Sequence, residues 1–167
     1  MRQSEKNLRA AIEAIPFGFV LFDADERFVF CSDTYRAINR KVADFLVPGV
    51  TFEDFIRALV DSRANRISDD VEGWIRERLE RFRNPGEPWE IVTDSGAVHL
   101  VQDIKTKDNE HIVLRTDITA LKENEKTIAD LSGRLRDAIE SVTDGVILFD
   151  KDERIVAFNE NYRRTLL

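Results

Sequence analysis

The chain has 167 residues, enough for one domain of ordinary size and an additional segment. Its net charge is −7 and it has no tract of lysine and arginine, which argues against nucleic acid or an anionic membrane surface as a partner. A single cysteine excludes an intrachain disulfide, and the longest apolar run, residues 14–22, is too short to span a bilayer. We therefore expect a cytoplasmic location and no membrane contact by this part of the protein, although the whole protein can still be membrane-attached.

An internal repeat organises the chain. Residues 8–36 align without gaps on residues 135–163, and 15 of the 29 aligned positions are identical, far more than chance provides. The sequence thus starts one module, completes it and starts the same module again. Because the second copy is too short to bury a core alone, we expect the chain to be a piece of a longer tandem protein.

The first module opens with a helix and a hairpin. Residues 1–16 predict a helix with Leu8, Ala11, Ile12 and Ile15 on one face, ended by Pro16. Strands are expected at residues 19–23 and 27–31, joined by an acidic turn.

Helices are expected in the middle of the module, with Thr51 and Ser68 as caps. Three strands at residues 89–93, 97–105 and 111–116 complete it. Since strands that are adjacent in sequence usually pair, this order predicts an α+β fold in which helices cover one face of an antiparallel sheet.

These features resemble the PAS family of sensory domains. The resemblance rests on Gly18-Phe-Val-Leu-Phe-Asp23, on the order of the elements and on Asp117-Ile118-Thr119 after the last strand, and it covers residues 8–119 and 135–167. Pro48-Gly49 resembles a subclass common in bacterial multi-domain sensors. The resemblance divides the chain into an N-terminal helix (1–16), a PAS domain (17–119), a connecting helix (120–142) and the start of a second PAS domain (143–167).

The resemblance implies a five-stranded antiparallel sheet that holds a ligand-sized pocket against its helices. It also implies a homodimer formed through flanking helices, and output to an effector domain in the same protein, such as a histidine kinase or a cyclic-di-nucleotide cyclase. One position departs from the family. Asn is frequent after the second strand and is present as Asn159, whereas the first copy has Ser32, so the ligand or the local turn is expected to differ.

No cofactor is expected. Flavin-binding relatives carry a reactive cysteine on a middle helix, whereas Cys31 ends the second strand and is expected to be a buried core residue. Haem-binding relatives take their iron ligand from a middle helix, whereas His99 and His111 fall on late strands and lack metal-ligand spacing.

Catalysis and metal binding find no support in the motifs. Asp23, Asp25 and Glu26 are interpreted as a hairpin turn and not as a cation site, because Arg27 follows them directly. No nucleophile elbow, glycine-rich phosphate loop or acid/base pair is present, so we expect no catalytic residue in this chain.

Asp117-Ile118-Thr119 is the candidate signal relay. Asp117 ends the last strand, Thr119 is expected to cap the following helix, and Asp117 is expected to tie that helix back to the domain. The alternative is an ordinary capping turn, which is compatible with a role in relay.

The heptad pattern of the connecting helix predicts a dimer seam, a stripe of side chains that packs against the same helix of a second copy. Leu121, Ile128, Leu135 and Val142 recur every seven residues, and Glu125, Ser132 and Ile139 take the other core position of the heptad. Because two of those three are polar, the seam should be weaker than a full zipper. The alternative is that this stripe packs on its own domain.

The sequence favours a sensory and dimerisation module that binds an unidentified small molecule or partner. The rival is a structural spacer without a ligand, and catalysis by this chain comes third. Polar side chains around an internal cavity favour sensing, whereas a core filled by phenylalanines favours the spacer.

Overall fold

The computed structural model describes residues 2–165 and divides the chain into two compact units, Met1–Thr119 and Ala120–Leu167. The side chain of Leu8, which the sequence places on the opening helix, lies outside the described side chains. Residues 166 and 167, the last of the second copy, also lie outside the described part.

The first unit is built on a five-stranded antiparallel sheet. The strands lie in the order β2-β1-β5-β4-β3, so that β5 occupies the centre. Gly96 lies at positive φ in the turn between β3 and β4, and Asn109 does so between β4 and β5. The predicted fold class is confirmed. The strands are β1 (Gly18–Phe22), β2 (Phe28–Cys31), β3 (Trp89–Val92), β4 (Val98–Lys105) and β5 (His111–Asp117).

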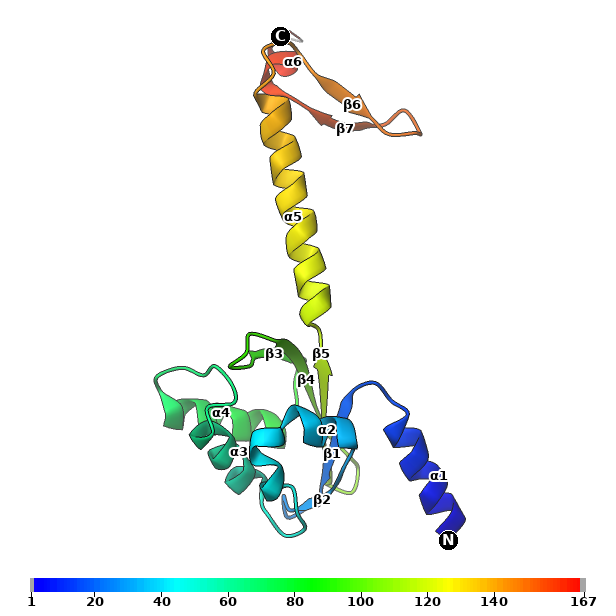
Figure 1. The fold of residues 1–167 in the computed structure, drawn as a ribbon, viewed down its shortest axis with the longest axis vertical. Coiled ribbons are helices and arrows are strands. Elements are labelled where there is room, and N and C mark those ends of the chain that lie inside the picture. Colours follow the sequence, from blue (N-terminus) through cyan, green and yellow to red (C-terminus); the bar gives the residue numbers. More distant parts are fainter. Residues whose placement is uncertain (1, 166–167) are drawn as a thin grey trace. The chain divides into compact units, whose positions relative to one another are not determined.

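Helices gather on one face of this sheet, as Figure 1 shows for α2, α3 and α4. The helical elements of the unit are α1 (Arg2–Glu13), α2 (Asp33–Ile38), the 3-10 helix η1 (Arg40–Phe45), α3 (Phe52–Asp61) and α4 (Val71–Arg83). The sequence analysis did not predict α2 and η1. Each has only six residues, too few to show a helical repeat of apolar positions.

One of the two predicted helix caps is confirmed. The Thr51 hydroxyl accepts a hydrogen bond from the amide of Asp54 at 3.2 Å and begins α3. The prediction of Ser68 as the cap of α4 is wrong. Asp70 directly precedes α4 and accepts from the amide of Gly73 at 2.9 Å, whereas the hydroxyl of Ser68 donates to the carbonyl of Asp70.

Stacked phenylalanines form part of the core between sheet and helices. Phe52 of α3 lies parallel to Phe82 of α4 with ring centroids 3.7 Å apart, and Phe22 of β1 meets both rings edge-on at 5.1 and 5.5 Å. All three are buried. Burial of such a side chain stabilises the fold by about 1.5–3 kcal/mol, so this cluster anchors the helices to the sheet.

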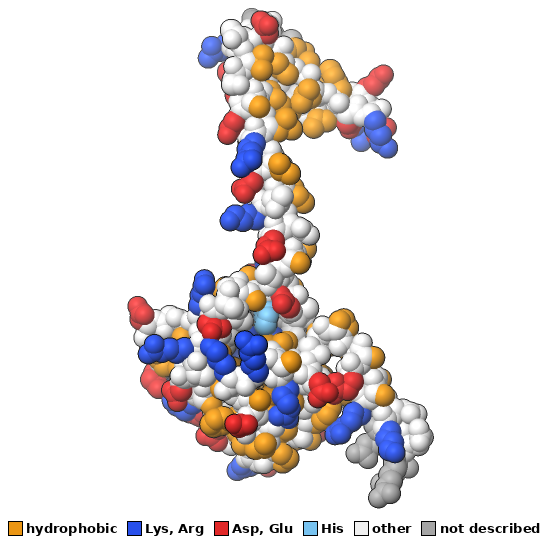
Figure 2. Space-filling model, viewed as in Figure 1, with side chains coloured by type: hydrophobic (Ala, Val, Ile, Leu, Met, Phe, Trp, Pro, Cys, Tyr) orange, Lys and Arg blue, Asp and Glu red, His pale blue; other side chains and the backbone are white. Residues whose placement is uncertain are grey.

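The second unit contains α5 (Thr119–Glu140) from its second residue onward, a hairpin of β6 (Ile147–Phe149) and β7 (Ile155–Phe158), and α6 (Glu160–Thr165). Ile139 and Asn159 are buried in it. The hairpin exposes large apolar side chains, and Figure 2 shows hydrophobic side chains gathered on this unit. They are Leu148, Phe149, Ile155, Val156 and Phe158.

Within residues 2–165 the longest helices remain too polar or too short to cross a lipid bilayer.

Candidate functional site

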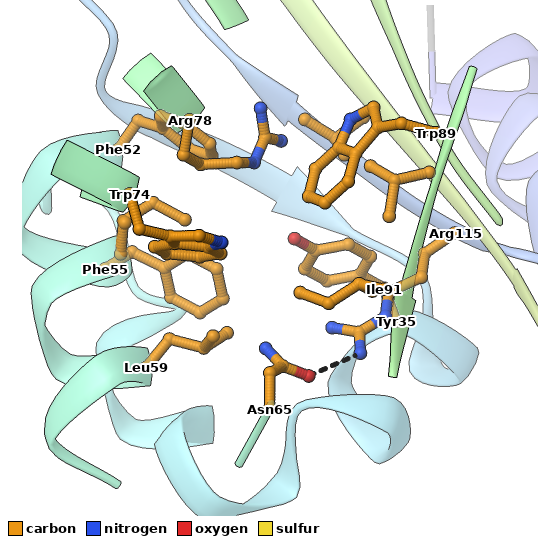
Figure 3. A pocket seen from close by; sticks show the side chains of 13 residues that line it. Tyr35, Phe52, Phe55, Leu59, Asn65, Trp74, Arg78, Trp89, Ile91 and Arg115 are labelled. Carbon is orange, nitrogen blue, oxygen red and sulfur yellow. Dashed lines mark hydrogen bonds between the residues drawn. The ribbon is translucent and has the colours of Figure 1, made fainter. Parts of the chain in front are cut away.

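A small cavity lies in the first unit between helices α3 and α4 and the sheet. Its volume is about 30 Å³. One part of its wall is apolar, with Phe55 and Leu59 of α3 and Ile91 of β3 (Figure 3). The only two tryptophans of the chain, Trp74 and Trp89, also line it. One water needs about 10–15 Å³, so the cavity has room for about two or three water-sized groups.

An ion pair closes one side of the cavity. Arg78 of α4 donates two hydrogen bonds to the carboxylate of Asp103 on β4, at 2.7 and 3.1 Å, and both side chains are buried. Trp89 adds a third bond to this carboxylate, from its indole nitrogen at 3.3 Å. The guanidinium also lies over the rings of Phe52 and Trp89. The charge of Arg78 is therefore fully matched inside the protein.

A second buried arginine, Arg115 on the central strand β5, has a different environment. Its Nε donates to Nδ1 of His99 at 2.8 Å, and its two terminal nitrogens donate to the side-chain oxygens of Asn39 and Asn65 at 3.0 Å each. Among the residues that the structure describes, no carboxylate forms an ion pair with Arg115. Since all three acceptors are neutral, the guanidinium is a buried positive charge without a counter-charge at bonding distance.

Asn65 directs an unused donor into the cavity. Arginine has no acceptor, so the amide oxygen of Asn65 must face Arg115 and its nitrogen must face away. Among the described residues, Nδ2 of Asn65 is the buried side-chain atom that lacks a hydrogen-bond partner. Figure 3 shows this amide and the hydroxyl of Tyr35 pointing into the same space.

Burial sets the protonation states around the cavity. It raises the pKa of Tyr35 to about 12, so this residue keeps its hydroxyl proton as a donor. Burial, and then the charge of Arg115, lowers the pKa of His99, so its ring is neutral near pH 7. Desolvation also lowers the pKa of Arg115, which remains a cation because the ordinary pKa of arginine lies far above neutral pH. The side chains around the cavity thus present hydrogen-bond donors and one unmatched positive charge.

The predicted relay residues lie at the start of α5, and the helix cap differs from the prediction. Asp117, not Thr119, caps the helix, since its carboxylate accepts from the amide of Thr119 at 2.9 Å and from its hydroxyl at 2.5 Å. Thr119 ties the helix to the sheet, because its hydroxyl accepts from the amide of Val98 on β4 at 3.0 Å. The amide of Ile118 donates to the carbonyl of the same Val98 at 2.9 Å.

Asp117 also faces the histidine of the cavity network. Its Oδ2 lies 3.7 Å from Nε2 of His99, the nitrogen that carries the proton because Nδ1 accepts from Arg115. Hydrogen bonds from Thr119 are the main cause that lowers the pKa of Asp117, and His99 adds to it. A continuous series of polar contacts therefore runs from Asn65 through Arg115, His99 and Asp117 to the first amide of α5.

The other candidate residues have structural surroundings. Cys31 is buried at the end of β2, and burial raises the pKa of its thiol, as expected of a core residue. His111 is buried on β5, where its ring stacks on Phe82 and Nδ1 lies 3.0 Å from the carbonyl of Phe82. No group of three or more potential metal-ligating side chains occurs within the described part of the chain.

The acidic turns are hairpin turns in both copies, as predicted. Asp23 accepts from the amides of Asp25 and Arg27 at 2.9 Å each, and Asp150 accepts in the same way from Asp152 and Arg154. The carboxylates are thus used by their own backbone.

Four of the five predicted seam residues are exposed on or just after α5: Leu121, Ile128, Leu135 and Val142. Leu131, which the heptad assignment left out, is exposed as well. Ile139 differs, because it is 8% exposed and belongs to the interior of the second unit.

The sequence analysis missed Asn65, Arg78 and Arg115. A signal for Arg78 exists, because it falls on the apolar stripe of its helix between Ile75 and Phe82, where a charged residue needs a buried partner. Asn65 lies in the loop after α3, and no local pattern marks it.

Comparison with known proteins identifies the family. A family model of the PAS fold matches residues 12–126, and a second, of the PAS domain, matches residues 133–166. The chain belongs to the PAS family. A search among curated proteins found no match.

Several solved PAS structures are similar to this chain at low identity. The PAS domain of BvgS from Bordetella pertussis is 17% identical, with a TM-score of 0.45, over 79% of this chain and 98% of that one. The PAS domain of an HTR-like protein from Haloarcula marismortui is 14% identical, with a TM-score of 0.41, over 70% and 93%. A domain of a sensory box sensor histidine kinase/response regulator from Geobacter sulfurreducens is 17% identical, with a TM-score of 0.35, over 68% and 94%.

The PAS position after the second strand accepts the same two backbone hydrogen bonds in both copies. Asn159 in addition donates to the carbonyls of Ile139, Val142 and Asp144, so the local surroundings of this position differ between the copies, as expected. Ser32 accepts from the amides of Phe19 and Tyr35, at 3.0 and 3.2 Å. Asn159 accepts from the equivalent amides of Val146 and Tyr162, at 2.8 and 2.9 Å. A hydroxyl and an amide oxygen both serve as helix caps, so either residue holds this PAS turn.

Proposed function

We propose that the chain is a sensory part of a bacterial signal-transduction protein of the histidine kinase or cyclic-di-nucleotide cyclase type. Membership of the PAS family supports a sensory signalling module. In this proposal a small molecule enters the cavity, the exit helix α5 carries the change, and an effector domain of the same protein responds. The chain itself catalyses no reaction. The ligand is small and colourless, since pockets for drug-sized molecules are roughly ten times larger than 30 Å³.

The observation that carries this proposal is the polar connection between the cavity and α5. Arg115 lies 3.0 Å from Asn65 and 2.8 Å from His99, and Asp117, which faces His99, holds the amide of Thr119. Buried hydrogen bonds join Asn65, Arg115 and His99, and the neutral His99 ring directs its N–H toward the carboxylate of Asp117 across 3.7 Å, so we expect a change at Asn65 to alter the interactions of Asp117. The stacked phenylalanines support the rival, a structural spacer, but a spacer has no use for an unpartnered donor in a cavity.

Hydrogen exchange tests the connection. Asn65→Leu removes the acceptor of Arg115 and fills the cavity, and we expect amide exchange at residues 119–122 to rise about tenfold. Asp117→Asn should produce a similar rise by removing the charged cap. If the two sites act through one network, the double variant will show less than the sum of the two effects.

A matched substitution serves as the control. Asn7→Leu makes the same change at an exposed position of α1 and should leave exchange in the first turn of α5 unchanged. Unchanged exchange in Asn65→Leu as well, with the sheet intact by circular dichroism, supports the spacer and contradicts the sensory proposal.

We further propose that the protein is a homodimer joined through α5. The supporting observation is the row of exposed apolar residues Leu121, Ile128 and Leu135 at intervals of seven, which a second helix would cover. Ile139 is already covered inside the second unit, and the polar Glu125 and Ser132 share its heptad position, which weakens the seam.

A charge at the centre of the seam tests the dimer. Ile128→Lys should shift the mass measured by light scattering toward the monomer while the circular dichroism of the sheet persists. Ala129→Lys adds the same charge on the neighbouring face and should leave the mass unchanged. Loss of the fold in Ile128→Lys without a change of mass would place this helix in the core of its own domain.

A further inference from the structure

The cavity holds the features of an anion site. Two arginines approach it, but only Arg78 has an acid partner, Asp103, at 2.7 Å. The charge of Arg115 is unmatched, so the cavity carries one net positive charge. Burial of an uncompensated charge is costly, and a negatively charged occupant is the direct way to offset that cost.

The hydrogen-bond groups around the cavity point to the same class of occupant. Asn65 is buried, 8% exposed, and directs an unused N–H into the space. The hydroxyl of Tyr35 points there too and keeps its proton (Figure 3). Arg115 has only donors, and neither Arg115 nor Asn65 forms a hydrogen bond with a carboxylate among the described residues. An acceptor-only group, such as a carboxylate, satisfies all of them at once.

We infer that the cavity binds a small monocarboxylate, with Arg115 as the cation and Asn65 and Tyr35 as additional donors. The available 30 Å³ admits about two or three water-sized groups, which is the size of formate, and acetate is larger by one methyl group. Longer chains of the same class require the apolar wall at Leu59 to move. Binding of this anion does not depend on the sensory function proposed above. A role of the anion as the signal does depend on it.

Intrinsic fluorescence reports occupancy, because both tryptophans of the protein, Trp74 and Trp89, line the cavity. Acetate and formate, titrated into the whole chain at constant ionic strength, should change the emission saturably and raise the melting temperature. Acetamide and formamide have the same shapes without the charge and should do neither. Equal responses to acid and amide, or no response to either, would overturn the assignment.

Two variants locate the site. Arg115→Gln should weaken acetate binding by about tenfold or more, and Arg76→Gln, at an exposed position of α4, should leave it unchanged. Asn65→Asp replaces the unused N–H by an oxygen and supplies the missing counter-charge from within. It should therefore abolish the acetate response and raise the melting temperature. A lower melting temperature in Asn65→Asp would mean that Arg115 is already compensated, and the inference would be wrong.

Hydrogen exchange at residues 119–122 with and without acetate separates the two proposals. Binding that slows exchange there supports both. Binding without any change in exchange supports the anion site and counts against its being the signal. Absence of binding excludes monocarboxylates as ligands of the cavity. The sensory function is then tested by Asn65→Leu and Asp117→Asn alone.

Discussion

Replacing Asp103 by asparagine measures how strongly the buried ion pair fastens α4 to the sheet. The two side chains are only 5% and 4% exposed, and two bonds of 2.7 and 3.1 Å join them. Asparagine keeps the shape but turns an amide toward the guanidinium and leaves Arg78 as an uncompensated buried charge. Removal of one partner from such a pair costs about 3–5 kcal/mol.

That cost is large enough to see in a thermal melt. For a unit of this size it lowers the melting temperature on the order of 10–20 °C, followed by circular dichroism. The control is Glu26→Gln, which breaks an ion pair with Arg83 at the surface and should cost less than about 1 kcal/mol. The double variant Arg78→Met/Asp103→Leu should recover most of the loss, because apolar residues can replace a buried pair.

An equally small loss of stability in Asp103→Asn and Glu26→Gln would contradict this prediction. That result would show that water or a rotated side chain compensates Arg78. Failure of the double variant to recover would mean instead that the third bond, from Trp89 to Asp103, carries much of the stability.

Three other predictions follow from the same description. Burial lowers the pKa of His99 and His111 below the ordinary 6.5, so below that pH the unfolded chain binds protons that the folded chain does not. The stability that the neutral histidines contribute is therefore present above about pH 6.5 and is lost as pH falls through the folded pKa values, and the melting temperature should fall with it. His111→Gln should make this fall in melting temperature smaller. Truncation after Val142 should leave the melting transition of the first unit nearly intact, because that unit has its own complete sheet, and a large loss would show that the second unit packs on it or is exchanged between protomers. Protein expressed with flavin and haem available should show neither a stoichiometric flavin spectrum nor a Soret band, and either band would contradict the absence of a coloured cofactor.

The fold was predictable because its signals are local. Alternating apolar residues, turn residues such as Gly96 and Asn109, and the repeat each act over a few positions or between copies of one module. The misses were also local. The short α2 and η1 have too few residues for periodicity, and at α4 two candidate caps, Ser68 and Asp70, lie close together in the sequence.

The cavity was not predictable because its members come from distant parts of the chain. Arg115 bonds Asn39 and Asn65, which are 76 and 50 residues away. No short pattern relates them, and only the register of β4 against β5, which sets Val101 opposite Arg115, brings His99 within reach. Even at Asp117 and Thr119, where the motif was recognised, the sequence did not decide which residue caps the helix.

The contrast between the two buried arginines bears on why the cavity exists. Arg78 shows that this fold can match a buried guanidinium with a carboxylate. A single substitution would give Arg115 a carboxylate as well, since aspartate at position 65 would place a negative charge where Asn65 now leaves a donor unused. A module selected only for stiffness would gain stability from that exchange. Asparagine at position 65 leaves the charge of Arg115 for an occupant of the cavity to compensate. Binding of that occupant would alter the contacts of Arg115 with His99 and of His99 with Asp117, and so bias the start of α5. The unpaired arginine is therefore better explained by sensing than by spacing.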